Sequence, residues 1–538
     1  MKSSINNHSY PYGLPRNSVF AKNGMVATSQ PLASQAGLEI LKKGGNAVDA
    51  AIATAACLTV VEPTSNGIGG DAFAIVWMKD KIYGINGSGG APDSISIDLI
   101  KKEGYQSMPK YGWYPVTVPG APKTWAALSE KFGVLSFKEV LSPAISYAQN
   151  GFPVSLISSS IWEREFEKMK SLSKREEFSE WFEVFAPKGR APFPGENWSS
   201  SDHAETLNQI ANTNGSTFYT GDIAKKISDY SKQTGGLIRY DDLASFDIEW
   251  VNPINLDYKG YDIWELPPNS QGIITLQALN ILKEFDLAKT DIIDNYHKQI
   301  EAIKLAFSDG LEHISDLKDM IFKTEDLLSE EYARNRAMLI NNNALTPYPG
   351  NPESSGTVYL ATADKEGNMV SFIQSNYKSF GSGVVVPGTG VALQNRGMEF
   401  SLDKNHVNSL KGKKKPYHTI IPGFLSKDNK PIGPFGVMGG YIQPQGHVQL
   451  ITNTIDFGLN PQSALDAPRW KWIKGKQIEV ENHFPHHIAL GLMEKGHEIS
   501  GQLDPKQFGR GQIIWRDYDT GMLVGGTESR TDGTISAW

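Results

Sequence analysis

The sequence predicts an α+β fold in which helices pack on β-sheets in layers. Helix-like and strand-like patterns follow one another without the regular alternation that builds a doubly wound sheet. Of the 538 residues, 40% are hydrophobic and 21% are charged, as is typical of globular proteins. No stretch approaches the ~18 consecutive apolar residues of a membrane-spanning helix. We therefore expect a soluble, layered protein that buries a large core.

The chain is predicted to begin with a short buried strand, 25–29, and two consecutive helices. The first helix, 31–43, ends at a Gly-Gly pair with lysines in its last turn. The second, 47–61, can be capped by Asn46 and is apolar on nearly every side, so we expect it to be buried all round. Its Cys57, the only cysteine, is interpreted as a core residue because it lies in an Ala-rich apolar run.

A glycine-rich turn, 62–73, leads into a predicted hairpin of strands 73–77 and 81–85. The turn lacks the Gly-Lys-Ser/Thr ending of a phosphate loop and opens no helix, so its glycines indicate tight turns. Residues 173–202 mix charges with Pro, Gly and Ser and are predicted to form a large surface loop. Helices are expected at 122–131, 141–150, 157–169, 205–213, 221–234, 271–285 and 291–315.

The last third of the chain has a different pattern, dominated by strands. Residues 357–363 and 369–375 are predicted to pair as a hairpin around the turn 364–368. The polar segment 341–355 before it is typical of a loop that exposes a processing site. Further strand-like segments are expected at 380–386, 389–393, 419–425 and 435–440, with a loop at 401–416 and a helix at 445–457.

Thr357, directly after Gly356 at the head of this hairpin, is a candidate nucleophile. Gly356 has no Cβ, so the Thr357 hydroxyl can approach its carbonyl carbon, as an N→O acyl shift requires. Cleavage would free an α-amine with an ordinary pKa of about 7.7–8.0, which can take the hydroxyl proton. The alternative is an ordinary turn before a strand, because a Gly-Thr dipeptide is not specific by itself.

Composition and motifs argue against several other functions. The formal charge of −7 and the pI near 5.9 disfavour a nucleic-acid partner, and the short basic run 411–415 is interpreted as a solvated loop. The N-terminus lacks the apolar core of a secretory signal, so we expect a cytoplasmic protein. The cluster His483, His486 and His487 has no Cys or acidic partners, and we expect no metal site there. No Gly-x-Ser-x-Gly nucleophile elbow is present.

Taken together, the motifs resemble the γ-glutamyltransferase family of N-terminal-nucleophile hydrolases from about residue 24 to the tail at 526–533. The resemblance rests on Gly24-Met25-Val26-Ala27-Thr28, Gly44-Gly45-Asn46-Ala47-Val48-Asp49-Ala50-Ala51, Gly67-Ile68-Gly69-Gly70, Val118-Pro119-Gly120, Phe218-Tyr219-Thr220-Gly221, Gly356-Thr357, Phe380-Gly381-Ser382-Gly383 and Met438-Gly439-Gly440. It implies a four-layer αββα sandwich made as a precursor. Self-cleavage would give a large subunit, 1–356, and a small subunit, 357–538, that remain one interlocked unit.

The resemblance also assigns the catalytic groups. It implies that Thr357 is the nucleophile, that its freed amine is the base, and that the Ser375 hydroxyl stands against that amine. The backbone N–H groups of Gly439 and Gly440 would form the oxyanion hole. Neither a cofactor nor a metal is implied.

The residues that hold the substrate depart from the family pattern. Typical members bind the glutamyl carboxylate with an Arg and its amine with Asn, Gln and Asp, whereas the equivalent positions here hold Ser88, Tyr377, Arg396 and Glu399. A serine pair that helps bind the carboxylate becomes His418-Thr419. Arg396 either supplies a carboxylate-binding cation from another direction or forms an ion pair with Glu399.

This substitution pattern resembles a divergent branch that includes γ-glutamyltransferase-like hydrolases, cephalosporin-type acylases and oxamate amidohydrolase. Even there the chain differs, because Gly90 falls where those relatives often carry an Arg. The loop 401–416 is also shorter than the lid of transferring members, which favours hydrolysis over transfer.

Three functions follow as hypotheses. The first is hydrolysis of γ-glutamyl amides such as glutathione, and the second is an amidase or acylase for oxamate- or glutaryl-type amides. The third is an uncleaved, non-catalytic binding protein, because a fold alone does not establish a function. The expected partners are a small amide and water, with no nucleic acid and no membrane. A homo-oligomer is compatible with the sequence.

Overall fold

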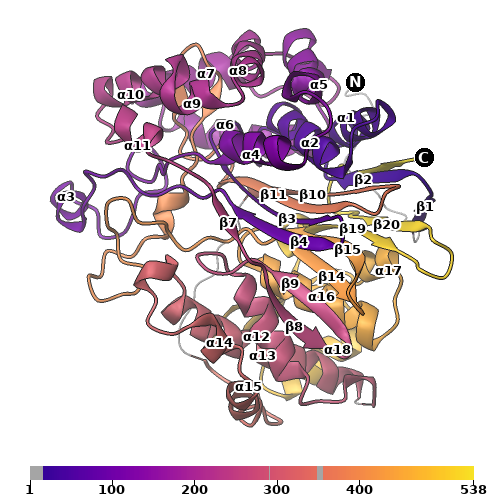
Figure 1. Ribbon diagram of the computed structural model, residues 1–538. Helices are drawn as coiled ribbons and strands as arrows, with labels where there is room; N and C mark the ends of the chain where they lie inside the picture. The colour runs from indigo at the N-terminus through magenta and orange to yellow at the C-terminus, as the bar shows by residue number, and fades with distance from the viewer. Residues whose placement is uncertain (1–15, 290, 348–355) are drawn as a thin grey trace, which may run out of the picture.

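The computed structural model describes residues 16–289, 291–347 and 356–538 and forms four layers, αββα (Figure 1). Two antiparallel seven-stranded sheets lie face to face within these residues. In spatial order, sheet A comprises β1 (Val19–Ala21), β20 (Leu523–Thr527), β19 (Arg510–Arg516), β15 (Lys430–Met438), β14 (Gly423–Lys427), β9 (Tyr261–Glu265) and β8 (Ile254–Tyr258). Sheet B comprises β21 (Thr534–Ala537), β2 (Gly24–Thr28), β10 (Gly356–Asp364), β11 (Met369–Tyr377), β3 (Asp71–Met78), β4 (Lys81–Asn86) and β7 (Glu249–Val251). The predicted sandwich is therefore confirmed.

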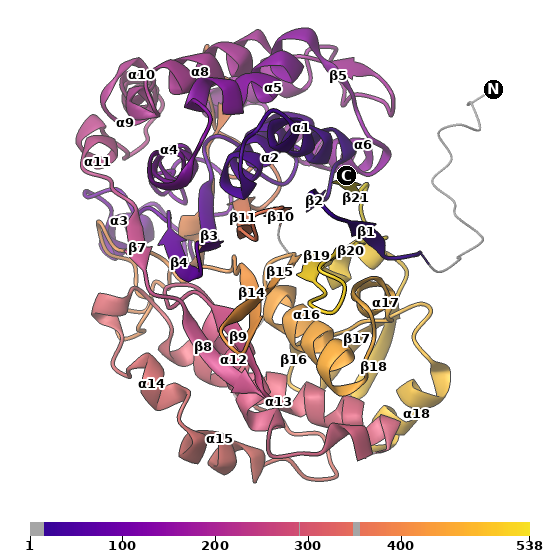
Figure 2. The same cartoon turned by 45° about the vertical axis from the view of Figure 1, so that its right-hand side comes forward.

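One helical layer covers the outer face of sheet B (Figure 2). Its innermost member is α2 (Ala47–Val61), which packs on β10 and β11 and is buried along its whole length, as predicted. Asn46 caps it in a capping box with Asp49, because each side chain accepts a hydrogen bond from the other residue's backbone N–H. The rest of this layer and its loops comprises α1 (Pro31–Lys42), α3 (Ile97–Lys102), α4 (Ala121–Phe132), α5 (Phe137–Asn150), α6 (Leu156–Lys170), α7 (Ser179–Phe185), α8 (Ser201–Asn212), α9 (Ser216–Thr220), α10 (Asp222–Gln233) and α11 (Tyr240–Ala244).

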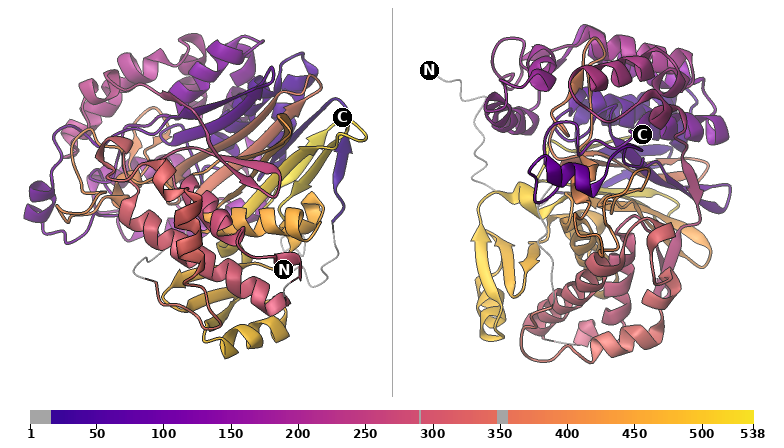
Figure 3. Two further views of the ribbon diagram at one scale, coloured as in Figure 1. Left: turned by 60° about the horizontal axis from the view of Figure 1, so that its bottom comes forward. Right: turned by 90° about the vertical axis from the view of Figure 1, so that its left-hand side faces the viewer.

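The second helical layer covers sheet A, as the two further views also show (Figure 3). α12 (Gly272–Leu282) packs on β8 and β9, and α16 (Ile442–Ile451) packs on β15. A small sheet of β16 (Trp470–Lys474), β17 (Gln477–Glu481) and β18 (Glu498–Gln502) lies beside them. The remaining α-helices among the described residues are α13 (Ile292–His313), α14 (Thr324–Leu327), α15 (Glu330–Ala337), α17 (Pro461–Asp466) and α18 (His486–Glu494). Two pairs of two-residue strands complete the described elements: β5 (Phe152–Pro153) with β6 (Asn197–Trp198), and β12 (Val385–Val386) with β13 (Val391–Ala392).

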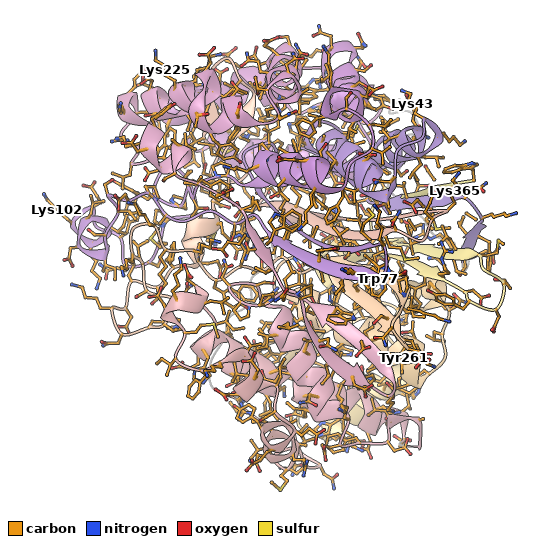
Figure 4. All side chains as sticks on the ribbon, in the orientation of Figure 1. Lys43, Trp77, Lys102, Lys225, Tyr261 and Lys365 are labelled. Atoms are coloured by element: carbon orange, nitrogen blue, oxygen red, sulfur yellow. The ribbon has the colours of Figure 1, made fainter. Side chains whose placement is uncertain are left out.

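Apolar side chains fill the space between the two sheets. Trp77 of β3 stacks on Phe424 of β14, with ring centroids 5.9 Å apart and planes 5° apart. Figure 4 places Trp77 at the level of the sheets, whereas the labelled lysines, Lys43 and Lys225 among them, project at the periphery. Within the described residues, no helix combines the length and apolar character needed to cross a bilayer.

Two expectations from the sequence are corrected. Residues 173–202 are not a surface loop: they contain α7, and Phe178, Trp181 and Phe185 are almost fully buried. The ring of Trp181 lies 5.3 Å from that of Phe380, which ties this segment to the core. The strand expected at 419–425 begins only at Gly423, because the residues before it are irregular and the Thr419 hydroxyl is engaged by the Arg396 side chain.

Candidate active site

The hairpin of β10 and β11 places Thr357 in the centre of the molecule. Gly356 pairs with Tyr377 and Val358 with Gln374, so the register shifts at Thr357. Such bulges bend a strand and redirect a side chain, and they are frequent beside active sites. Thr357 is fully buried. The predicted hairpin is confirmed. The bond proposed for cleavage, between Gly356 and Thr357, joins the first two residues of β10.

Ser375 of β11 faces Thr357 across this hairpin. Their hydroxyl oxygens are 3.1 Å apart, within hydrogen-bond distance. The Ser375 hydroxyl also accepts a hydrogen bond from the backbone N–H of Tyr377, at 2.8 Å. This second contact fixes the serine rotamer, so the Ser375 hydroxyl is held in place beside the Thr357 hydroxyl.

Arg396 enters the same site from a 3₁₀ turn, Arg396–Glu399. Its Nη1 donates to Thr419 Oγ1 at 2.6 Å and its Nη2 donates to Ser375 Oγ at 3.5 Å. The guanidinium lies 4.1 Å from the centre of the Tyr377 ring, a cation–π distance. Its Nε has no hydrogen-bond partner among the residues that the structure describes, and burial lowers the pKa of this fully buried side chain.

Glu399, three residues later, does not pair with Arg396. Its carboxylate accepts hydrogen bonds from the hydroxyl groups of Tyr377 and Tyr441 instead. Of the two alternatives for Arg396, the ion pair is therefore not formed. Among the residues that the structure describes, no carboxylate is in ion-pair contact with the Arg396 guanidinium.

His418, which the sequence marks as a substrate-binding candidate, forms a buried pair beside this group with Asp71, a residue that sequence reasoning missed. Asp71 of β3 lies opposite Ser375 in the sheet register, and its Oδ2 is 3.0 Å from His418 Nε2. His418 Nδ1 accepts from the Ile420 N–H at 3.4 Å, so Nε2 carries the proton and donates to Asp71. Burial raises the pKa of Asp71 to about 7 and lowers that of His418 well below its usual value.

A buried glutamine, also missed, connects the site to the two glycines of β15's end. Gln271 Nε2 donates to the carbonyl oxygens of Thr419, at 2.6 Å, and Gly440, at 3.0 Å. Gly439 and Gly440 have φ values of +135° and +71°, which glycine adopts without steric cost. A continuous hydrogen-bonded path thus runs from Thr357 through Ser375, Arg396, Thr419 and Gln271 to Gly440.

Comparison with known proteins identifies the family. A model described as gamma-glutamyltranspeptidase matches residues 33–538. The chain belongs to the γ-glutamyltranspeptidase family. It is 39% identical over 530 residues to the glutathione hydrolase-like YwrD proenzyme of Bacillus subtilis, covering 96% of this chain and 98% of the relative. It is 31% identical over 529 residues to the oxamate amidohydrolase proenzyme of Klebsiella pneumoniae, with the same coverage of each chain.

Solved structures support the same assignment. A cephalosporin acylase from Bacillus halodurans superposes with a TM-score of 0.97 at 58% identity, covering 100% of this chain and 99% of that one. The γ-glutamyltranspeptidase of Helicobacter pylori gives a TM-score of 0.54 at 28% identity, covering 61% and 94%. These neighbours establish an enzyme of the γ-glutamyltransferase type with the fold of an N-terminal-nucleophile hydrolase.

In this member of the γ-glutamyltranspeptidase family, a cavity of about 900 Å³ reaches the outer edge of the site at Glu399, Tyr417 and Tyr441. The loop 401–416 forms part of its wall through Ser401 and Asn408. Residues of β17 and β18 and of the turn before β17 lie across the cavity. A small molecule therefore has room directly beside the Arg396 and Glu399 turn.

Ser88 and Gly90, the two positions at which the sequence departs from an Arg of its relatives, are both closely packed. The Ser88 hydroxyl donates to Asn86 Oδ1 at 2.7 Å, and Ser88 is fully buried. At Gly90, a Cβ would lie 2.4 Å from the carbonyl oxygen of Lys413, so the backbone leaves no room for a side chain. The loop 401–416 thus occupies the space that an Arg at residue 90 would need. Arg396 instead supplies a cation next to Ser375, which contacts Thr357.

A metal-like cluster occurs elsewhere, at His297, Glu301 and His497, whose donor atoms lie within 4.8 Å of one another. These donors already bond to protein groups: His297 Nδ1 is 2.8 Å from His497 Nε2, and Lys304 Nζ is 2.7 Å from Glu301 Oε1. The ammonium would repel a metal cation. The cluster instead holds the chain near Leu345, whose N–H donates to Glu301 Oε2 at 3.1 Å.

Proposed function

We propose that the protein is a self-processing threonine amidohydrolase that cuts itself between Gly356 and Thr357. The observation that carries this proposal is the 3.1 Å contact between the Thr357 and Ser375 hydroxyls at the bulge in β10. Membership of a family whose relatives are described as proenzymes supports it. Cleavage would give a large subunit, 1–356, and a small subunit, 357–538.

The cleavage proposed here needs two steps. In the first, Thr357 Oγ attacks the carbonyl carbon of Gly356, and the C–N bond breaks as the Thr357 amine takes the hydroxyl proton. In the second, water hydrolyses the resulting ester, which leaves a carboxylate on Gly356 and a free Thr357 amine. That amine is a suitable general base near neutral pH.

Substrate hydrolysis would repeat the same chemistry on an external amide. Thr357 Oγ attacks the substrate carbonyl while the amine of Thr357 takes its proton, and the N–H groups of Gly439 and Gly440 stabilise the oxyanion. The amide nitrogen leaves with that proton, and water then releases the acid from the acyl-enzyme. Ser375 holds the threonine in position throughout.

The acyl group of the substrate should carry a carboxylate at its far end. Arg396 is a fully buried cation beside Thr357 with no carboxylate in contact among the described residues. A buried charge is costly without a counterion, and a guanidinium binds a carboxylate through two hydrogen bonds. Gamma-glutamyl amides, glutathione-like compounds among them, meet this requirement.

A second candidate substrate class, glutaryl- or oxamate-type amides, is favoured by one specific contact. Both oxygens of Glu399, the residue at the position where typical members bind the glutamyl amine, already accept hydrogen bonds from Tyr377 and Tyr441. An acyl group with the carboxylate but without the amine would leave these bonds intact. Relatives described as cephalosporin acylase and oxamate amidohydrolase agree with this alternative.

Water is the proposed acyl acceptor. The cavity of about 900 Å³ beside Tyr417 and Tyr441 brings solvent to the edge of the site. Loop 401–416 is packed against the protein, with Asn408 Nδ2 donating to the Glu399 carbonyl at 2.8 Å. A loop held in this way closes less completely over an acyl-enzyme than a free lid, so hydrolysis is favoured over transfer.

The intact mass of the denatured protein tests self-processing. Prorating the 59.2 kDa chain by length, the wild type should give pieces of roughly 39 and 20 kDa, the smaller beginning at Thr357, whereas Thr357→Ala stays whole. Release of the aniline from γ-glutamyl and from glutaryl anilides then separates the two substrate classes. A wild type that remains one chain and hydrolyses neither would refute the mechanism and favour a binding protein.

A further inference from the structure

A second cavity, of about 320 Å³, is lined mainly by positive charges. It lies where α6, the segment after β11 and the segment before β19 meet. Its lining includes two carboxylates, Glu165 and Asp504, but six cationic side chains: Lys110, Arg164, Lys168, Lys378, Lys506 and Arg510. The catalytic mechanism uses none of these residues.

Arg510, the first residue of β19, is the buried member of this cavity. Its side chain is only 6% exposed, and its Nε and Nη1 have no hydrogen-bond partner within the described part of the chain. Nη1 lies 3.6 Å from Glu62 Oε1, an ion-pair contact without a hydrogen bond. Because buried N–H groups are normally bonded to protein, water or an ion, this guanidinium has donors to offer to a further acceptor.

The carboxylates of the cavity are already engaged by lysines of the lining. Glu165 Oε1 is 2.7 Å from Lys168 Nζ and 3.4 Å from Arg164 Nε. Asp504 Oδ1 is 4.0 Å from Lys506 Nζ, whose hydrogen bond goes to Ser160 Oγ at 3.4 Å. Glu62 likewise faces Arg510, so the lining holds acids as well as cations. Among the described residues, the buried donors left without a hydrogen-bond partner here are Nε and Nη1 of Arg510.

We propose that this cavity binds a phosphate group, either free or on a small phosphomonoester. A buried guanidinium with unused N–H donors suits phosphate, which accepts several hydrogen bonds and carries more than one negative charge. The volume lies at the lower end of the range for small-ligand pockets, enough for a phosphate with a short organic group. This proposal is independent of the reaction at Thr357.

The position of the cavity gives its occupant a route to the active site. Lys378 directly follows Tyr377, and Asn395 directly precedes Arg396, and both line the cavity. Asn395 Oδ1 accepts a hydrogen bond from the Lys378 N–H at 3.1 Å, which joins the two segments. A bound phosphate would therefore hold together the backbone on which the cation–π pair of Tyr377 and Arg396 is built.

Calorimetric titration of the full chain with inorganic phosphate, at fixed ionic strength, tests the proposal. We expect one phosphate per chain with a Kd below about 1 mM, and at least tenfold weaker binding in Arg510→Gln and in Lys506→Gln. Lys506 is partly exposed, so its variant serves even where Arg510→Gln fails to fold. Lys225→Gln, which removes an equal charge at the periphery, should bind like the wild type (Figure 4).

Two results would overturn the proposal. One is a wild type that shows no saturable heat of binding at phosphate concentrations up to 10-fold above the expected Kd. The other is equal phosphate affinity in Lys506→Gln and Lys225→Gln. A parallel titration with glycerol phosphate identifies the source of the group. Tighter binding than inorganic phosphate supports a phosphomonoester, and weaker binding supports the free anion.

Discussion

Replacing Arg396 by methionine should remove substrate recognition without weakening the fold. The guanidinium is fully buried, donates to Thr419 and Ser375, and has no carboxylate partner among the described residues. Loss of a desolvated contact between a guanidinium and a carboxylate costs about 2–5 kcal/mol. For a glutaryl or γ-glutamyl anilide, kcat/KM should therefore fall by roughly 30- to 4,000-fold, since ~1.4 kcal/mol is a factor of ten.

The matched substrate is a butyryl anilide, which has the same chain but no terminal carboxylate. Its kcat/KM should change by less than about tenfold in Arg396→Met, because the lost contact is absent from its complex. Arg396→Lys keeps the charge without the bidentate geometry and should recover part of the activity toward the glutaryl substrate.

Stability should move in the opposite direction to activity. Burial of this cation is costly, and methionine fills similar space without a charge, so the Tm of Arg396→Met should equal or exceed that of the wild type. An equal loss of kcat/KM on the glutaryl and butyryl substrates, or a large drop in Tm, would show that Arg396 supports the structure rather than the substrate.

Three further predictions test other parts of the site. Gly90→Ala should lower the free energy of unfolding by about 1–3 kcal/mol through overpacking, whereas Gly501→Ala, where a Cβ meets nothing within 4 Å, should leave the melting temperature unchanged; equal effects would contradict the packing argument. The pKa of Asp71 is raised to about 7, so between about pH 4 and 7 the folded state binds a proton that the unfolded state has lost, and the free energy of unfolding falls as the pH rises through that window. Asp71→Asn should flatten this part of the curve of Tm against pH. An unchanged slope would exclude Asp71 as its source. Glu301→Gln breaks the buried ion pair between Lys304 and Glu301, whose carboxylate also accepts a hydrogen bond from the Leu345 N–H. The variant should therefore slow the appearance of the two subunits on a denaturing gel. Processing at the wild-type rate would argue against a role of Glu301 in positioning the chain near Leu345.

The sequence was most informative where local chemistry and burial agree. Asn46 and the Ala-rich run after it predict α2 to the residue, because a cap and an apolar helix leave no competing structure. The segment 173–202 was predicted wrongly, since its charges and prolines obscured the apolar spacing of Phe178, Trp181, Phe182 and Phe185. That spacing, i, i+3, i+4 and i+7, is a helical signal and was available.

The site itself was only partly predictable. Thr357 follows from the Gly-Thr pair at the head of the hairpin, whereas Ser375 was assigned by the family resemblance. The spacing of Arg396 and Glu399 favours an ion pair equally well, and only the structure shows that their side chains bond to different groups. Asp71 left a signal in the sequence, an acid heading an apolar strand, which is costly unless it is paired. Gln271 left none, because a glutamine at the start of a helix is ordinary.

The position of β10 within sheet B has a consequence for refolding. This strand lies between β2, near the N-terminus, and β11, and sheet A likewise joins β9 to β14. With the proposed cut before Thr357, each sheet would be built from two polypeptides. Folding of the precursor would be a first-order process, whereas recovery of the cleaved enzyme after denaturation would be bimolecular. Its refolding yield should depend on protein concentration, and that of Thr357→Ala should not.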